Sequence, residues 1–180
     1  MEKENSGEEY YDEEVPEKLN EVDQFSLDQR FAEATKDDQE IKSSYEKLMA
    51  HKDVRYSDLT SPFNGSKVAG YMKKCKNKTS FFKKDLVKRF FFLDFNLQTL
   101  FVSEDQNEMA NRKSISFHNI LSCTPCFEIK KQKSKTFNKP FMLETRGRFF
   151  ELYTPSEDER EMWMAAFDYV IKSTRVVVRI

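Results

Sequence analysis

The spacing of apolar residues is helical over residues 25–50. Apolar side chains recur there at alternating three- and four-residue steps, the period of an amphipathic helix. They are Leu27, Phe31, Ala34, Ile41, Tyr45 and Leu48. Ser26 and Gln29 have the spacing of a capping box at the helix start. Because Asp38 lies on the same seam, we expect a helix docked on a domain or a partner rather than a sustained coiled coil.

Beyond Lys67 the apolar pattern changes to that of short strands. Seven runs rich in β-branched and aromatic residues follow one another, with a long lysine-rich loop over residues 76–85 between the first two. They cover Val68–Cys75, Leu86–Asp94, Thr99–Ser103, Lys113–Ile120, Cys123–Lys130, Lys139–Thr145 and Arg148–Tyr153. Short strands joined mostly by hairpin-length turns predict a mainly β fold, an antiparallel sandwich or partly open barrel.

The last predicted element is a second helix. Ser156 and Glu159 form another capping box, directly after Pro155. Trp163 and Phe167 then lie on one apolar face. A helix with so wide an apolar side needs a partner surface, so we expect it to close the open end of the barrel with Trp163 largely buried.

Charge and aromatic content divide the chain near residue 66. Residues 1–66 carry 8 basic and 18 acidic groups, a net charge of 8 − 18 = −10, whereas residues 67–180 carry 22 and 13, a net of 22 − 13 = +9. Of the 17 Phe, 14 lie in the second part. An acidic arm before a basic, Phe-rich domain indicates that the domain meets an anionic partner. We expect an acidic disordered tail (1–24), an amphipathic helix (25–50), a linker (51–66), the β domain (67–173) and a C-terminal extension (174–180).

The sequence offers little for catalysis or metal chemistry. It has two His, and no glycine-rich phosphate loop among its four Gly. Cys123 and Cys126 form a single closely spaced pair, whereas a structural metal site normally needs two. We therefore expect no enzyme, no cofactor and no metal. An odd number of cysteines and no signal-peptide pattern favour a cytoplasmic protein with reduced thiols.

Basic and aromatic residues alternate over residues 73–92, a composition also found in nucleic-acid-binding proteins. The aromatic residues Phe90–Phe92, however, form a continuous run of the buried type rather than spaced stacking platforms. We expect no nucleic-acid partner. The same run is far shorter than the roughly 20 residues that cross a bilayer, so any membrane contact is expected to be peripheral.

Three segments of the β region form a recognisable pattern. They are Gly70–Lys74 in the first strand, Lys88–Leu93 in the second, and Phe149–Ser156 leading to Trp163, the single Trp. In this order and spacing the chain resembles the pleckstrin homology (PH) domain family over residues 67 to about 173. The resemblance implies a seven-stranded antiparallel sandwich, closed at one end by the helix that carries Trp163.

The resemblance also implies a binding site. Many PH domains hold phosphoinositide headgroups between the first two strands, with a lysine and a basic-x-arginine triplet. The lysine corresponds to Lys74 and the arginine to Arg89. The first basic position of the triplet holds Val87, and Lys88 points to the other strand face. This departure argues against high-affinity recognition of 3-phosphorylated lipid.

Positive charge is dense around this hairpin. Its basic residues are Lys73, Lys74, Lys76, Lys78, Lys83, Lys84, Lys88 and Arg89, against one acid, Asp85. Clustered lysines near an anionic leaflet contribute on the order of 1 kcal/mol each. Phe81 and Phe82 are candidates for membrane insertion, or alternatively begin the second strand and enter the core. Arg112 and Lys113, at the start of the fourth predicted strand, are expected to add a contact from the neighbouring loop.

Two functions follow. The first is a non-catalytic module that binds phosphoinositides or other anionic phospholipids and recruits the chain to cytoplasmic membranes. The second is a protein-interaction scaffold, linked to a cytoskeletal or small-GTPase assembly, in which the helix over residues 25–50 contacts a protein partner. The lysine density of the hairpin favours the first, and Val87 together with the long helix favours the second.

Overall fold

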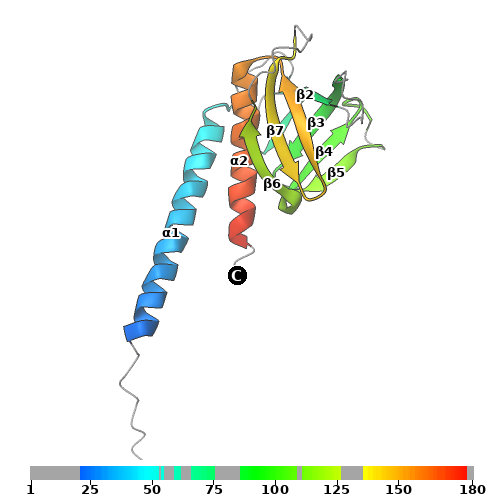
Figure 1. Ribbon diagram of the computed structural model, residues 1–180. Helices are drawn as coiled ribbons and strands as arrows, with labels where there is room; N and C mark the ends of the chain where they lie inside the picture. Colours follow the sequence, from blue (N-terminus) through cyan, green and yellow to red (C-terminus); the bar gives the residue numbers. More distant parts are fainter. Residues whose placement is uncertain are drawn as a thin grey trace, which may run out of the picture. The chain divides into compact units, whose positions relative to one another are not determined.

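A computed structural model gives the fold of the chain (Figure 1). It describes residues 21–52, 54, 59–61, 66–75, 86–108, 111–126 and 136–177. Two compact units are present, residues 1–36 and residues 37–180. The expected tail up to residue 20, the lysine-rich loop over residues 76–85 and the chain end over residues 178–180 lie outside the described residues.

The second unit is built on one antiparallel sheet. Its strands are β1 (Leu59–Ser61), β2 (Lys67–Cys75), β3 (Leu86–Asp94), β4 (Thr99–Ser103), β5 (Lys113–Ser116), β6 (Ile120–Pro125), β7 (Lys139–Thr145) and β8 (Arg148–Thr154). Seven of them pair in the order β5-β4-β3-β2-β8-β7-β6, and β1 pairs with β2. The predicted seven-stranded antiparallel architecture is confirmed. β1 is an addition, because three residues within the stretch expected to be a linker are too few to give a strand pattern.

The chain turns a corner where the sequence predicts one strand over Lys113–Ile120. After β5, the short 3₁₀ helix η1 (Phe117–Asn119) redirects the backbone, and β6 begins at Ile120. The Phe117 N–H donates to the Gln98 carbonyl (2.9 Å), and the Asn119 carbonyl accepts from the Arg146 N–H (2.8 Å). These contacts tie the corner to the β3–β4 turn on one side and to the β7–β8 turn on the other, which explains why strand pairing stops there.

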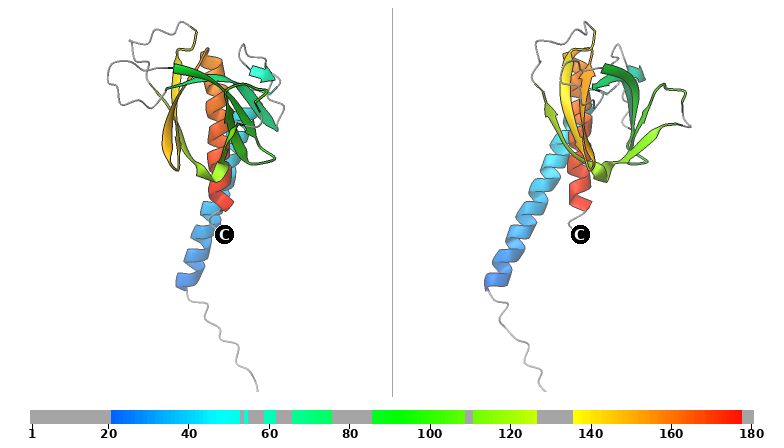
Figure 2. Two further views of the ribbon diagram at one scale, coloured as in Figure 1. Left: turned by 90° about the vertical axis from the view of Figure 1, so that its right-hand side faces the viewer. Right: turned by 45° about the vertical axis from the view of Figure 1, so that its right-hand side comes forward.

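Helix α2 (Glu157–Val177) contacts β6, β7, β8 and η1 (Figure 2). The Ser156 hydroxyl caps its start by accepting from the Glu159 N–H at 3.1 Å. Trp163 and Phe167 are fully buried and stack with ring centroids 5.9 Å apart. The predicted burial of Trp163 is confirmed.

Helix α1 spans Glu21–Met49, close to the predicted 25–50, and its last turns belong to the second unit. Leu48 is 1% exposed and lies in the hydrophobic core. The Ser44 hydroxyl donates to Asp168 Oδ2 (2.7 Å) and accepts from Lys172 Nζ (2.9 Å). The C-terminal end of α1 is thus packed against α2. None of the helices described here is long and apolar enough to span a membrane.

Candidate anion-binding site

The β2–β3 ladder separates the predicted basic residues onto two faces. Met72 pairs with Arg89, and Lys73 pairs with Lys88. Cross-strand partners share a face, and neighbours along a strand alternate. Since Met72 is fully buried in the core, Arg89 lies on the inner face, as does Lys74 two positions after Met72. Lys73 and Lys88 lie on the outer face.

Lys74 and Arg148 share one aromatic ring on the inner face. The Lys74 Nζ lies 5.6 Å from the centroid of the Phe150 ring, and the Arg148 guanidinium carbon lies 4.4 Å from it. Phe150 is 5% exposed and is part of the core. Cation–π contacts of this length are favourable, so the ring holds both cations at the edge of the core.

Lys113 completes this group from β5. It pairs with Val102, which is 7% exposed and packs in the core, so Lys113 lies on the inner face as well. We call Lys74, Arg89, Lys113 and Arg148 the inner basic cluster. Within the described part of the chain, neither Lys113 nor Arg148 forms an ion pair.

The charges of the cluster act on one another. Partial burial lowers the pKa of Lys74, and the positive charges of Arg148, Arg89 and Lys113 lower it further. Each cation therefore raises the free energy of the charged Lys74 side chain. A bound anion would reverse this penalty, which is the electrostatic property expected of a phosphate site.

Arg89 has an acidic partner. One guanidinium nitrogen lies 2.6 Å from Glu104 Oε1, and the Glu104 side chain is 67% exposed. The same arginine donates a hydrogen bond to the Lys88 carbonyl at 3.0 Å. An ion pair with so exposed a carboxylate is weak, so an incoming phosphate competes with it at modest cost.

The outer face carries its own cation–aromatic contacts. The Nζ atoms of Lys73 and Lys88 lie 5.0 and 5.6 Å from the Phe137 ring centroid. The guanidinium carbon of Arg112 lies 3.9 Å from the centroid of the Phe101 ring. Lys73, Lys88 and Arg112 are thus apart from Lys74 and Arg89, although the sequence groups all five.

The remaining predicted residues of this hairpin lie outside the described residues. They are the cations Lys76, Lys78, Lys83 and Lys84 and the insertion candidates Phe81 and Phe82. Their roles stay predictions.

From the sequence, Lys113 is expected only as a loop contact beside Arg112, and its place on the inner face is missed; Arg148 is missed altogether. The signal for each was strand alternation: Arg148 precedes Phe150 and Leu152 at two-residue steps, and Lys113 precedes Ile115. Each lies on the apolar side of its strand. What alternation does not give is their convergence, because they come from strands far apart in the sequence.

Cys123 is a partly buried thiol outside the inner basic cluster. Burial raises the pKa of Cys123 to about 12, with smaller contributions from Asp168 and Cys126, so this thiol stays protonated at neutral pH. In the residues that the structure describes, no three His, Cys, Asp or Glu side chains gather to hold a metal ion.

Comparison with known proteins identifies one family. The family model for the PH domain matches residues 67–172, more than half of the chain. The chain is similar to the solved human PH domain of TBC1 domain family member 2, with 19% identity, a TM-score of 0.46, and coverage of 65% of this chain and 90% of that one. It is also similar to the N-terminal PH domain of human ARAP2, with 20% identity, a TM-score of 0.45, and coverage of 64% and 87%. Among curated proteins, none matches the chain significantly.

Proposed function

The chain belongs to the PH domain family, and from this premise we propose that it binds phosphoinositides or other anionic phospholipids and is thereby recruited, as a peripheral protein, to cytoplasmic membranes. PH domains are lipid- or protein-binding modules, are generally non-catalytic, and are typically cytoplasmic. The proposed role is binding alone, with no reaction and no cofactor.

The observation that carries this proposal is the inner basic cluster. Four cations come from four strands of one sheet face, and Glu104 is the acid that pairs with one of them. A phosphate monoester carries nearly two negative charges at neutral pH and several strong acceptor oxygens. Charge-assisted hydrogen bonds from lysine and arginine to such a group are among the stronger ones in proteins.

The lysines beyond the cluster add affinity without specificity. Those of the β2–β3 hairpin and Arg112 would each contribute on the order of 1 kcal/mol near an anionic leaflet. Phe81 and Phe82, if they lie at the loop tip, would enter the headgroup region. Headgroup binding by the cluster and this diffuse attraction then act together, as in other two-signal membrane anchors.

A second candidate is a protein-interaction scaffold. The ion pair between Arg89 and Glu104 favours it, because the arginine expected to hold a phosphate already has a partner. Helix α1 favours it too: among its described side chains, only Ser44 and Leu48 are buried. The surface of α1 before Ser44 is then the contact for a cytoskeletal or small-GTPase-linked partner.

Co-sedimentation with vesicles tests the proposal. The full chain is mixed with vesicles of phosphatidylcholine alone, of phosphatidylcholine with phosphatidylserine, and of phosphatidylcholine with phosphatidylinositol bisphosphate at matched charge. We expect pelleting with both anionic compositions, stronger with the phosphoinositide and weakening as salt rises, because screening shortens the reach of charge. If the chain stays in the supernatant with every anionic vesicle at low salt, the lipid-binding proposal is wrong and the protein-interaction scaffold is favoured.

A further inference from the structure

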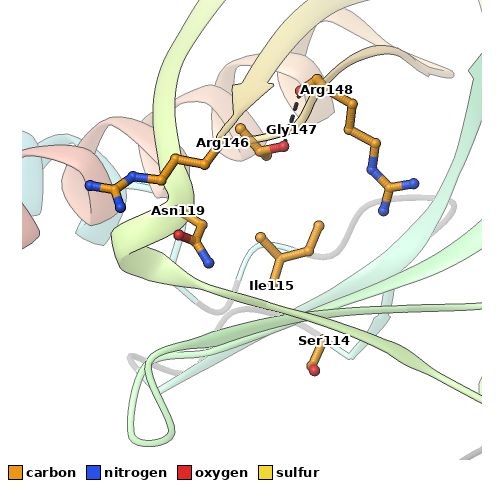
Figure 3. Close-up of a pocket in the computed structure, with 7 residues that line it drawn as sticks. Ser114, Ile115, Asn119, Arg146, Gly147 and Arg148 are labelled. Carbon is orange, nitrogen blue, oxygen red and sulfur yellow. Dashed lines mark hydrogen bonds between the residues drawn. The ribbon is translucent and has the colours of Figure 1, made fainter.

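A small cavity lies between β5 and the β7–β8 turn (Figure 3). Its volume is about 310 Å³, and it is open on one side. This is at the lower end of the range of sites for small molecules, enough for one phosphorylated ring. Its labelled lining residues are Ser114 and Ile115 of β5, Asn119 of η1, and Arg146, Gly147 and Arg148 at the turn.

The chemistry of the cavity suits an anion. The residues that line it are two arginines, an asparagine, a serine, a threonine, an isoleucine and a glycine, with no Asp or Glu. In Figure 3 the side chains of Arg146 and Arg148 extend to opposite sides of the turn. Arg146 runs past Asn119, away from Ile115, whereas Arg148 extends along the side where Ile115 lies. Arg148 is therefore the arginine that a ligand in the cavity meets, and its planar guanidinium matches phosphate oxygens well.

The turn that presents these arginines is held in place. The Arg146 N–H donates to the Asn119 carbonyl at 2.8 Å, and the Thr145 hydroxyl donates to the Arg148 carbonyl at 3.0 Å. The Arg148 guanidinium is further fixed over the Phe150 ring at 4.4 Å. A cation that is already positioned loses little freedom on binding.

The cavity and the inner basic cluster share Arg148. That residue lines the cavity, lies over the same ring as Lys74, and acts electrostatically on it. On β5, Lys113 directly precedes the lining residue Ser114. The positive region therefore extends from the β2–β3 hairpin to the β7–β8 turn.

We infer that this cavity holds a phosphate group of the phosphorylated headgroup, with Arg148 supplying the cation that β3 lacks at Val87. The inference rests on the proposed function and deepens it, because it moves the centre of the site from the β2–β3 hairpin toward β5 and β8. The ligand class is a phosphorylated inositol or a similar phosphate ester, either as a membrane lipid or free in solution.

The test uses the full chain and two probes, soluble inositol trisphosphate and vesicles that contain phosphatidylinositol bisphosphate. Arg148→Met removes one charge and keeps an apolar stem over Phe150. Lys67→Met is the matched control, because Lys67 lies at the far end of β2 and contacts Phe92 on the outer face. We expect Arg148→Met to weaken binding about tenfold or more, the loss expected for a charge-assisted hydrogen bond, and Lys67→Met to change binding of the soluble probe by less than about twofold.

A second readout locates the ligand. In amide spectra, the Gly147 N–H should shift when inositol trisphosphate is added to the wild type, and the shift should require a higher concentration in Arg148→Met. If Arg148→Met binds both probes more weakly than the wild type, free inositol phosphates enter the cavity. If it binds only the vesicles more weakly, the phosphate is assigned to the membrane lipid. A wild type that binds while Arg148→Met binds equally well would overturn the inference and leave the proposed function intact. A wild type that binds neither probe contradicts the proposed function itself.

Discussion

Val87 lies directly opposite Lys74 in the β2–β3 ladder. Cross-strand partners share a face. The isopropyl group of Val87 therefore lies beside Lys74, at the position where the PH pattern has the first basic residue of its basic-x-arginine triplet. The inner basic cluster takes its additional charges from Lys113 of β5 and Arg148 of β8 instead. The site is thus basic although its sequence motif is incomplete.

Restoring the missing cation should strengthen binding. Val87→Lys places an ammonium group on the inner face beside Lys74, where it gains a charge-assisted contact with a phosphate. We expect the affinity for soluble inositol trisphosphate, measured by calorimetry, to rise about tenfold.

Leu86→Lys is the control for net charge. It adds the same charge one residue away, and strand alternation places it on the outer face. Its affinity for the soluble probe should stay within about twofold of the wild type. An equal gain in the two variants would show that charge alone, and not its face, governs binding.

The depressed pKa of Lys74 predicts how binding and stability depend on pH. Lys74 loses its proton at a lower pH than an ordinary lysine, so inositol phosphate binding should weaken as pH rises through that lowered pKa. Between this lowered pKa and the ordinary lysine pKa of 10.5, the unfolded state holds more protons at this site than the native state. The contribution of Lys74 to the free energy of unfolding therefore increases with pH in that window.

Lys74→Met separates these two effects. It should bind the probe weakly at every pH, and its melting temperature at neutral pH should equal or exceed that of the wild type, because a half-buried cation among like charges has been removed. A variant that melts several degrees lower would mean that Lys74 stabilises the fold, contrary to this electrostatic account.

Trp163 tests the packing of α2. The side chain is fully buried, and Trp163→Ala should lower the free energy of unfolding by about 3–5 kcal/mol, as measured by denaturant titration. Trp163→Phe should have a smaller effect, since the indole Nε1 has no hydrogen-bond partner among the described residues. Equal losses in the two variants would point to a role for the indole nitrogen that these contacts do not show.

Leu48 tests whether the end of α1 belongs to the domain. It is 1% exposed within the core, so Leu48→Ala should lower the free energy of unfolding by about 2–5 kcal/mol. Lys47→Ala is the matched control, because Lys47 is exposed one position earlier on the same helix. A destabilisation no larger than that of Lys47→Ala would show that α1 is dispensable for the fold.

The sequence predicts the strands best where alternation is regular. β2, β3, β4, β7 and β8 fall within one residue of their predicted ends, and the buried Trp163 follows from the helical period. The prediction fails at Phe117, where an apolar residue that continues the strand pattern instead fills the corner at η1. Tertiary contacts with Gln98 and Arg146 decide that conformation, and local periodicity does not contain them.

The site shows the same limit. Alternation places Val87 and Arg89 on one face and Lys88 on the other, and the ladder has this arrangement. The sequence nevertheless groups Lys73 and Lys88 with Lys74, because charge density along a chain ignores which face each residue occupies. Arg148 joins Lys74 only because β2 and β8 pair, at Lys73 with Tyr153 and at Lys74 with Leu152, a long-range contact that one sequence does not reveal.

The central claim is that headgroup binding belongs to the inner face of the sheet. The most direct measurement is the ratio of partition coefficients onto phosphatidylinositol bisphosphate vesicles and onto charge-matched phosphatidylserine vesicles. It compares the wild type with two double variants that each remove two positive charges, Lys74→Met/Arg148→Met on the inner face and Lys73→Met/Lys88→Met on the outer face. We predict a ratio above one for the wild type, a ratio near one for the inner pair, and, for the outer pair, weaker binding to both vesicles with the ratio preserved. A preserved ratio in the inner pair, or its loss in the outer pair, would contradict the account.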